Sequence, residues 1–455
     1  YDYDAPISEP GWTTEKFFLL RDLLKNYLPA GETLPAVPAA LPVIEIPEFH
    51  FHKVAPLFSN LPEAKQTVDI QPMEQFNQGW GTILYRTTLP ETTLAGTTLK
   101  ITEVHDWAQI YADGKLLARL DRRKGEFTTT LPALKKGTQL DILVEAMGRV
   151  NFDKSIHDRK GITEKVELIS GNQTKELKNW TVYNFPVDYS FIKDKKYSDT
   201  KILPTMPAYY KSTFTLDKVG DTFLDMSTWG KGMVWVNGHA MGRFWEIGPQ
   251  QTLFMPGCWL KEGENEILVL DLKGPTRASI KGLKKPILDV LREKAPETHR
   301  KDGEKLKLTG EKVGHEGAFT PGNGWQEVRF ATPVKGRYFC LEALSPQAND
   351  NIAAIAEFDV LGADGKPVSR EHWKIRYADS EETRSGNRTA DKIFDLQEST
   401  FWMTVDNVPY PHQLVIDLSK VENVTGFRYL PRAEKGYPGM IKEYRVYVKP
   451  ADFNY

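Results

Sequence analysis

The sequence has few of the residues that several classes of protein require. Only two cysteines, Cys258 and Cys340, occur in 455 residues, too few for a disulfide framework or a cysteine metal cluster. No apolar run reaches the ~18 residues of a membrane span. The 59 basic and 61 acidic side chains nearly cancel and form no long block of one sign. We therefore expect buried free thiols, no membrane span and no nucleic-acid partner.

Motifs of well-known catalytic sites are missing as well. The sequence contains no G-x-S-x-G turn, no P-loop and no dinucleotide fingerprint. His50 and His52 would share one face of a strand, but no third ligand follows at short range, so we expect edge-strand histidines. Among 61 acidic residues, residue type alone singles out no catalytic carboxylate pair. We predict no catalytic residue, metal or cofactor in this chain.

Aromatic residues, by contrast, are plentiful at 11%, with 11 tryptophans. Such a surplus is typical of carbohydrate binders and also of β-sandwich cores. Residue 1 is not Met and no charged-then-apolar leader is visible, so we expect any export signal to lie outside this chain. Four glycosylation triplets permit a secretory route without requiring one. They begin at Asn172, Asn179, Asn387 and Asn423.

The beginning of the chain predicts one helix, over residues 12–28. Thr13 or Thr14 can cap it, and Pro29 stops it. Its apolar residues fall on one side, at Phe17, Phe18, Leu20, Leu24 and Leu28. Repeated prolines then predict an extended linker over 31–62.

Two similar sets of strands follow, because the apolar period changes to two from about residue 62. Asp113-Gly114 predicts a type I′ hairpin turn, and Asn237-Gly238 occupies the equivalent place 124 residues later. Tyr85-Arg86 and Tyr210-Lys211 hold an offset of 125. The constant offset indicates an internal duplication, and we expect two antiparallel sandwiches, at 63–185 and 186–292.

The last third of the chain predicts another β domain. A charged stretch over 293–312 has little apolar periodicity and predicts a second linker. A short helix is expected near 284–293. Strand-like segments return after the linker and continue to the end, so we expect a third β domain at 313–455 and a mainly β chain.

Long motifs in the first 292 residues resemble glycoside hydrolase family 35 β-galactosidases. YDYDAPISEPG and the helix after it resemble the last loop and helix of that family's (β/α)₈ barrel. The resemblance implies that residues 1–30 end a catalytic barrel and that two galactose-binding-like jelly rolls follow. Further segments carry it in the same order: YRTTLP, EVHDWAQIYADGK, ILVEAMGRVNF, KGITEKVEL, MPAYYKSTF and WGKGMVWVNGHAMGRFWEIGPQQTLFMP.

The family resemblance also implies site residues. The two catalytic glutamates of the family precede the YDYDAP motif, so we expect neither in this chain. Tyr3, and secondarily Tyr1, occupy motif positions whose aromatic rings line the galactose pocket; the alternative is that both rings only pack the barrel mouth. No structural Ca²⁺ is indicated in the jelly rolls. Core packing and contact with the barrel explain four other aromatic residues better than a sugar platform does: Trp229, Trp235, Phe244 and Trp245.

The third domain resembles discoidin-type (coagulation factor 5/8 C) modules with its segments in an altered order. The order implies a circularly permuted or truncated module. Ligands of such modules sit in loops at one end of the sandwich, which implies Trp402, Arg432 and Tyr437 as glycan-binding candidates. The alternative is a purely structural domain.

These features predict the C-terminal portion of an exo-acting, retaining β-galactosidase outside the cytoplasm, with β-galactoside glycans as partners. This chain alone would be inactive. One alternative is a non-catalytic array of carbohydrate-binding modules, and another is an inert structural relative. The helix at 12–28 separates the first two, because a binding array has no use for an exposed apolar helix face. The sequence leaves the linkage, the natural glycan and the oligomeric state open.

Overall fold

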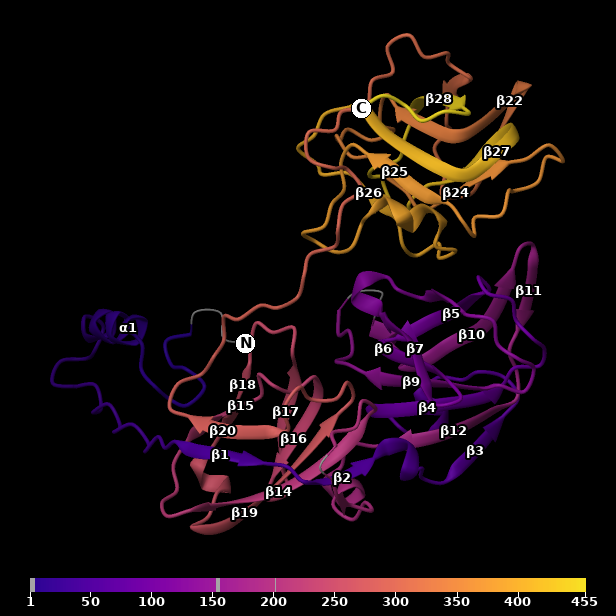
Figure 1. Cartoon of the computed structure of the whole chain (residues 1–455). Coiled ribbons are helices and arrows are strands. Elements are labelled where there is room, and N and C mark those ends of the chain that lie inside the picture. The colour runs from indigo at the N-terminus through magenta and orange to yellow at the C-terminus, as the bar shows by residue number, and fades with distance from the viewer. Residues whose placement is uncertain (1–4, 153–155, 201) are drawn as a thin grey trace. The chain divides into compact units, whose positions relative to one another are not determined.

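The computed structural model describes residues 5–152, 156–200 and 202–455. Three antiparallel β domains account for nearly all of the regular structure (Figure 1). The mainly β prediction is therefore confirmed. Tyr1 and Tyr3 lie outside the described residues.

The first sandwich consists of a six-stranded sheet and a four-stranded sheet. Tyr85 and Trp180 from the larger sheet and Val166 from the smaller one are fully buried in one shared core. In spatial order, the larger sheet contains β3 (Ala64–Thr67), β12 (Trp180–Phe185), β4 (Gly81–Thr88), β9 (Gln139–Ala146), β6 (Trp107–Ala112) and β7 (Lys115–Asp121). The smaller sheet contains β11 (Gln173–Glu176), β10 (Gly161–Ser170), β5 (Thr98–His105) and β8 (Thr128–Thr130).

The second sandwich is discontinuous in the chain, whereas the sequence predicted one continuous segment at 186–292. It takes two strands from before the first sandwich, and residues 1–62 and 186–294 form one compact unit. Its six-stranded sheet contains β13 (Ser198–Asp199), β2 (Lys53–Pro56), β14 (Ala208–Leu216), β19 (Gly263–Asp271), β16 (Lys231–Val236) and β17 (His239–Trp245). Its four-stranded sheet contains β1 (Ile46–His50), β20 (Ser279–Leu283), β15 (Thr222–Asp225) and β18 (Thr252–Met255).

The predicted linker over 31–62 is accordingly wrong beyond residue 45. Pro47 lies in β1, which is an edge strand and whose register with β20 shifts between Ile46 and Phe49. An edge position accommodates a proline because the missing N–H faces no partner strand. The sandwich therefore begins inside a stretch whose prolines suggested an unpaired linker.

The internal duplication is visible in the sheets. Strands β4, β9, β6 and β7 are neighbours in that order, and β14, β19, β16 and β17 repeat it. Both predicted turns have positive φ at both residues: 45° and 78° for Asp113 and Gly114, and 49° and 87° for Asn237 and Gly238. These are the signs that a type I′ turn requires.

The third domain places its two longest strands side by side. β22 (Gln326–Ala343) pairs with β27 (His412–Leu430) and, on its other side, with β28 (Glu443–Lys449). β21 (His315–Ala318) extends the sheet beyond β28, while β24 (Glu357–Leu361) and β25 (Lys374–Ala378) both pair with β27. A small two-stranded sheet joins β23 (Ala354–Ile355) to β26 (Trp402–Met403). Phe339, Phe358 and Phe427 are fully buried in the core.

Helices are few and short. α1 (Glu15–Lys25) begins after Thr14, whose hydroxyl donates to the Pro6 carbonyl at 2.9 Å instead of capping the helix. The only other α-helix in the part of the chain that the structure describes is α2 (Tyr189–Ile192), and no described helix is long and apolar enough to cross a membrane. The 3₁₀ turns are η1 (Leu57–Ser59), η2 (Met73–Phe76), η3 (Arg122–Lys124), η5 (Gly257–Trp259) and η6 (Ala390–Phe394).

The segment between the second and third domains differs from its prediction in two ways. Residues 284–293 form no helix. Leu306, inside the predicted linker, is buried in a cluster with Tyr377 and Phe453, and Lys307 forms a β-bridge with Asn454. The third domain therefore begins before residue 313, because Leu306 in this charged stretch packs against buried residues of that domain.

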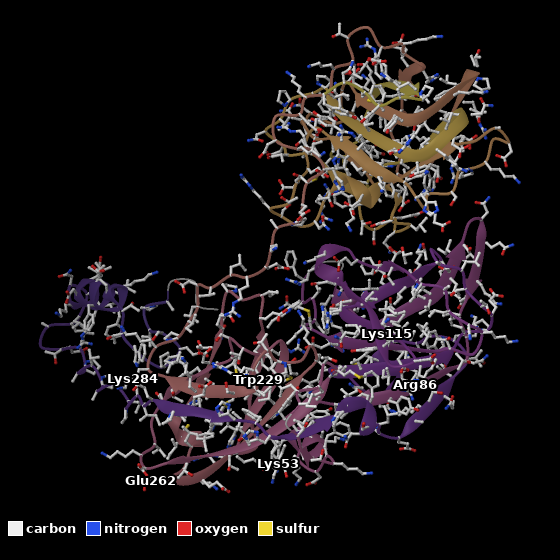
Figure 2. All side chains as sticks on the ribbon, viewed as in Figure 1. Lys53, Arg86, Lys115, Trp229, Glu262 and Lys284 are labelled. Atoms are coloured by element: carbon white, nitrogen blue, oxygen red, sulfur yellow. The ribbon has the colours of Figure 1, made fainter. Side chains whose placement is uncertain are left out.

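The predictions for single residues have mixed outcomes. Cys340 is buried, and its burial raises the pKa of the thiol, whereas Cys258 is free but exposed, which corrects the expectation of two buried thiols. His50 ends the edge strand β1, as expected, whereas His52 lies between β1 and β2 and belongs to neither strand. Trp229, labelled in Figure 2, is 1% exposed and donates from its indole to the Ser279 carbonyl at 2.9 Å. Trp235 and Phe244 are buried too, so core packing is confirmed for these three aromatic residues.

Candidate functional site

The strongest candidate for a binding site in the described residues lies at one end of the third domain. Three short segments meet there: a hairpin over 382–388, the strand β26, and the loop over 431–440. The Arg388 N–H donates to the Glu382 carbonyl at 3.1 Å, and the Arg388 carbonyl accepts from the Met403 N–H at 3.2 Å. The first segment is thereby fixed to β26.

The side chains of this end gather around one aromatic ring. The guanidinium carbon of Arg388 lies 4.2 Å from the centroid of the Phe401 ring. The guanidinium carbon of Arg432 lies 4.6 Å from the same centroid. A guanidinium group at such a distance is attracted by the negative face of the ring. We call Arg388, Phe401 and Arg432 the arginine–phenylalanine cluster.

The two arginines of the cluster differ in their partners. Arg432 forms an ion pair with Glu434 and also donates to Met403 Sδ at 3.4 Å. Among the described residues, Arg388 has no carboxylate partner, and its side chain is half-buried. Burial and then the positive charge of Arg432 lower the pKa of Arg388. The cluster thus holds two cations, of which only Arg432 has a carboxylate partner, Glu434, among the described residues.

The other two residues that the sequence proposed for this end have different positions. Trp402 is 1% exposed and donates from its indole to the Ser380 carbonyl at 3.0 Å, so its ring belongs to the core. Tyr437 is 36% exposed, with φ at 56°, and its N–H donates to the Glu434 carbonyl. Arg432 and Tyr437 therefore belong to the same loop, whereas Trp402 offers no free ring face.

Sequence reasoning missed Arg388 and Phe401. The place of Phe401 becomes clear only in the folded chain, where Thr400, Trp402 and Thr404 alternate along an extended segment and all three are buried. The period of two directs Phe401 to the opposite face. No sequence pattern identified Arg388, whose contact with the Phe401 ring depends on how its hairpin folds.

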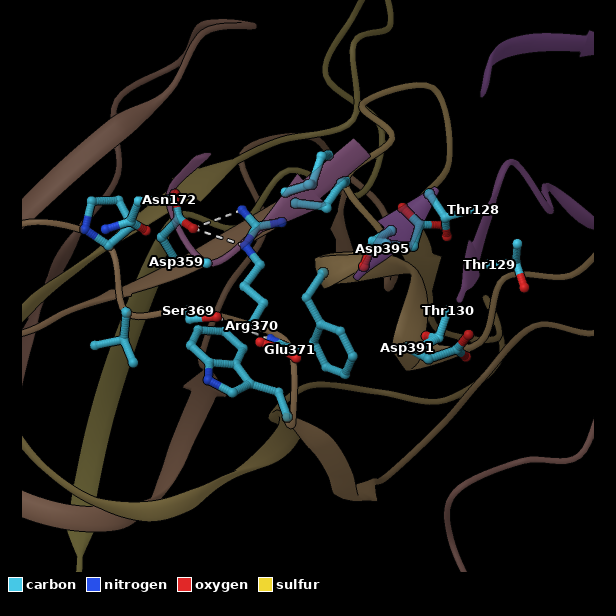
Figure 3. Close-up of a pocket in the computed structure, with 18 of the residues that line it drawn as sticks. Thr128, Thr129, Thr130, Asn172, Asp359, Ser369, Arg370, Glu371, Asp391 and Asp395 are labelled. Atoms are coloured by element: carbon cyan, nitrogen blue, oxygen red, sulfur yellow. Dashed lines mark hydrogen bonds and ion pairs between the residues drawn. The ribbon is translucent and has the colours of Figure 1, made fainter. Parts of the chain in front are cut away.

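Third-domain residues that line part of a pocket form a second group of charges (Figure 3). The side chain of Arg370 donates to Asp359 Oδ1 at 2.8 Å and forms an ion pair with the buried Glu357. Arg428 donates to Asp359 Oδ2 at 2.9 Å. Each of these guanidinium groups already has a carboxylate partner, so the group locks the strands together and leaves no unpaired charge for a ligand.

A larger buried network lies in the first sandwich. Lys160, whose side chain is fully buried, contacts Asp106 Oδ2 at 2.7 Å and Asp158 Oδ2 at 2.8 Å. Arg122 lies 2.8 Å and 2.6 Å from the other oxygens of the same two carboxylates. Hydrogen bonds from Lys160 and Arg122 outweigh the effect of burial and lower the pKa of Asp158 to about 2. Each of the two cations contacts both carboxylates, so we interpret this network as structural.

The network fixes the backbone that follows β9. Asp106 Oδ2 accepts from the Met147 N–H at 2.7 Å, and Asp158 Oδ2 accepts from the Val150 N–H at 3.1 Å. Arg149 forms an ion pair with Glu74 at 2.6 Å and donates to the Asp158 carbonyl. Residues 147–150 are thereby held in place.

Family models identify most of this architecture. Residues 71–186 match "Beta-galactosidase, first all-beta domain" and residues 207–265 match "Beta-galactosidase, galactose-binding domain". Residues 377–455 match "F5/8 type C domain". Strands β22 and β24 precede that last match, yet they complete its sheet. The interpretation of this domain as a permuted or truncated module stays a prediction.

Curated relatives agree with the family models. The chain is 34% identical over 346 residues to "Beta-galactosidase" of Bos taurus, which covers 66% of this chain and 49% of the relative. It is 32% identical over 307 residues to "Beta-galactosidase 1" of Dictyostelium discoideum, covering 60% and 44%. The chain spans less than half the length of these relatives, and it carries domains of the β-galactosidase type.

Proposed function

We propose that this chain is the C-terminal portion of an exo-acting, retaining β-galactosidase that removes terminal β-galactosyl residues from glycans. The proposal places the catalytic carboxylate pair in a barrel outside this chain. Retaining glycosidases use two carboxyl groups ~5 Å apart, one to protonate the leaving oxygen and one to attack the anomeric carbon. The two sandwiches would brace that barrel.

The observation that carries this proposal is the exposed apolar surface of α1. None of its residues is buried, although five apolar side chains are between 43% and 64% exposed. A contiguous apolar surface of this kind is typical of a contact with another domain. The names of the curated relatives support β-galactosidase as the parent activity. The exposed side chains are Phe18, Leu19, Leu20, Leu23 and Leu24.

Within the same proposal, Tyr3 positions the galactosyl residue, and Tyr1 is the secondary candidate for a contact with it. A phenol presents an apolar face to a sugar and a hydroxyl that both donates and accepts a hydrogen bond. In the full-length protein, Tyr3→Phe should lower turnover of an aryl β-galactoside, because it removes that hydroxyl. Kinetics equal to those of the unchanged enzyme would contradict the role of Tyr3.

A non-catalytic array of carbohydrate-binding modules is the second candidate. The F5/8 type C match and the galactose-binding match favour it. The exposed apolar face of α1 disfavours it, because a binding array has no use for such a face. Either function fits a place outside the cytoplasm and β-galactoside glycans as partners. Turnover by the full-length natural protein distinguishes the two, because a binding array would have none.

A further inference from the structure

We propose that His299 and Glu381 form an acid-dependent clasp, which fastens the linker from the second sandwich onto the third domain. The clasp sets how many residues of this linker are free to move, and it opens as pH rises. The inference goes beyond the hydrolase function, because it concerns the tether of the third domain and no step of catalysis.

The linker is held at both of its ends. On the second sandwich, the Arg292 N–H donates to the Ile247 carbonyl at 2.7 Å. On the third domain, the His299 backbone N–H donates to Glu381 Oε2 at 2.5 Å, and the ring Nδ1 lies 2.8 Å from Oε1 of the same carboxylate. Within the described part of the chain, residues 294–298 form no hydrogen bond or ion pair. Only this short stretch is therefore free while the clasp is closed.

The carboxylate side of the clasp is fixed in the third domain. The Glu381 side chain is only 1% exposed. Two residues earlier, Asp379 Oδ2 lies 2.8 Å from Nδ1 of His412, a fully buried residue of β27. Segment 379–381 therefore stays with the domain. The His299 side chain is 27% exposed and belongs to the linker, so it is the partner that can move away.

The charge of the histidine decides whether the clasp is stable. Among the described residues, Glu381 has no cationic partner besides His299. A buried carboxylate is costly unless a cation compensates its charge. Burial alone would lower the pKa of His299, but the hydrogen bond and the charge of Glu381, together with the charge of Asp391, outweigh burial and raise this pKa. The protonated ring is therefore the form that the folded domain favours.

Two further charged groups lie at the clasp. Asp391 Oδ1, in η6, is 4.0 Å from Nε2 of His299 and also favours the protonated ring. Arg300, the next residue of the linker, donates to the Asp379 carbonyl at 3.0 Å. Arginine keeps its charge at every pH near neutrality, so this contact does not change with pH. Because the Arg300 side chain is exposed, we expect it to add little to the attachment.

The direction of the pH response follows from the raised pKa. A histidine whose folded pKa lies above its ordinary value of 6.5 contributes stability that is fully present below pH 6.5. This contribution is lost as pH rises through the higher folded value. Once the ring is neutral, Glu381 is left buried without a cation. The clasp is therefore closed in acid and open in base.

Opening the clasp lengthens the free part of the linker. The next ion pair along the chain joins Glu304 to Arg376 at 3.2 Å and contains no histidine. Without the contacts of His299, the free stretch extends from 294–298 to 294–303. A longer flexible tether lowers the effective concentration of the two domains that it joins. The clasp thus makes the reach of the third domain depend on pH.

The test is hydrogen exchange of the whole 455-residue chain, measured by mass spectrometry at about pH 5.5 and about pH 8. Each rate is divided by the intrinsic rate of an unstructured peptide at the same pH. The His299 amide donates into the clasp, so its protection reports the closed state directly. We expect the protection of the peptide that contains His299 to fall about tenfold or more between the two pH values. Equal protection at both would overturn the proposal.

Matched variants assign the response to the clasp. His299→Gln keeps a side-chain donor but cannot titrate, and Glu381→Gln removes the buried charge, so protection in both variants should be independent of pH. His372→Gln is the control, because His372 is a 76% exposed histidine of the same domain, and it should respond to pH as the wild type does. A response that persists in His299→Gln, or that disappears in His372→Gln, would contradict the assignment. None of these outcomes bears on hydrolysis by the full-length protein.

Discussion

The ammonium group of Lys160 lies 2.7 Å from Asp106 Oδ2 in the first sandwich, and neither side chain is more than 7% exposed. Asp158 Oδ2 at 2.8 Å and the Gly148 carbonyl at 3.0 Å accept the remaining donors. A lysine has three N–H donors, so every one of them is used. Lys160 therefore helps to hold residues 147–150 in place, directly at Gly148 and through the two carboxylates that accept from Met147 and Val150.

Replacement of Lys160 by methionine should therefore be strongly destabilising. The variant leaves two buried carboxylates without their ammonium partner, and removing one partner of a buried ion pair costs roughly 3–5 kcal/mol. Hydrogen exchange of β6, β9 and β10, measured by mass spectrometry, reports the local change. The control is Lys165→Met, because Lys165 is 43% exposed in its pair with Glu167 and should cost under ~1 kcal/mol. Equal effects of the two variants would contradict a structural network.

The first sandwich should also lose stability in acid through Asp158. The folded pKa of Asp158 is about 2, below the ordinary 3.8. A depressed carboxyl pKa stabilises the fold above the unfolded value, and this stability, about 2 kcal/mol, is lost as pH falls from 3.8 towards 2. Thermal unfolding of the wild type and of Asp158→Asn should converge as pH falls through this window. Parallel curves would show that Asp158 contributes nothing.

The pairing of β16 with β19 should not tolerate a side chain at Gly232. A Cβ atom there would lie 1.7 Å from the carbonyl oxygen of Leu270, so Gly232→Ala has to push the two strands apart. Overpacking costs ~1–3 kcal/mol, and a backbone clash belongs at the upper end. Gly324→Ala is the control, because no atom lies within 4 Å of the added Cβ. Calorimetric unfolding should show a lower transition temperature for the first variant alone.

The apolar face of α1 should matter only in the presence of a neighbouring domain. Leu23 and Leu24 are 52% and 53% exposed, so replacing both with glutamine should leave the thermal unfolding of this chain unchanged. In the full-length protein the same change should lower thermal stability and turnover, because it removes buried apolar contacts. Unchanged thermal stability and turnover of the full-length variant would show that α1 makes no apolar contact with another domain.

Local signals in the sequence predicted what depends on neighbouring residues. The positive φ values at Asp113-Gly114 and Asn237-Gly238 follow from residue types that tolerate them. The constant offset between the two strand sets predicted two similar sandwiches, and in the structure their larger sheets share the order of four strands. The membership of β2 was not predictable in this way, since Lys53–Pro56 pairs with β14 more than 150 residues later. A strand of four residues shows too little periodicity to predict which distant strand it will pair with.

Only part of the candidate site was predicted, because some of its contacts join residues that are distant in the sequence. Arg432 and Tyr437 were identified through the resemblance of their segment, and their binding role stays a prediction. Arg388 reaches the Phe401 ring only because its hairpin bonds to Met403 across β26. Trp402 attracted attention as an aromatic residue, but its place in the alternation of a strand directs it to the core. Lys160 gave no signal, because charge in a sequence does not indicate burial.

Hydrolysis of an aryl β-galactoside, measured side by side for this chain and for the full-length natural protein, tests the central claim most directly. We expect turnover by the full-length protein and none by the 51.8 kDa chain, because the carboxylate pair is proposed to lie outside it. Turnover by a clean preparation of this chain, or no turnover by a full-length protein that carries a barrel, would contradict the claim.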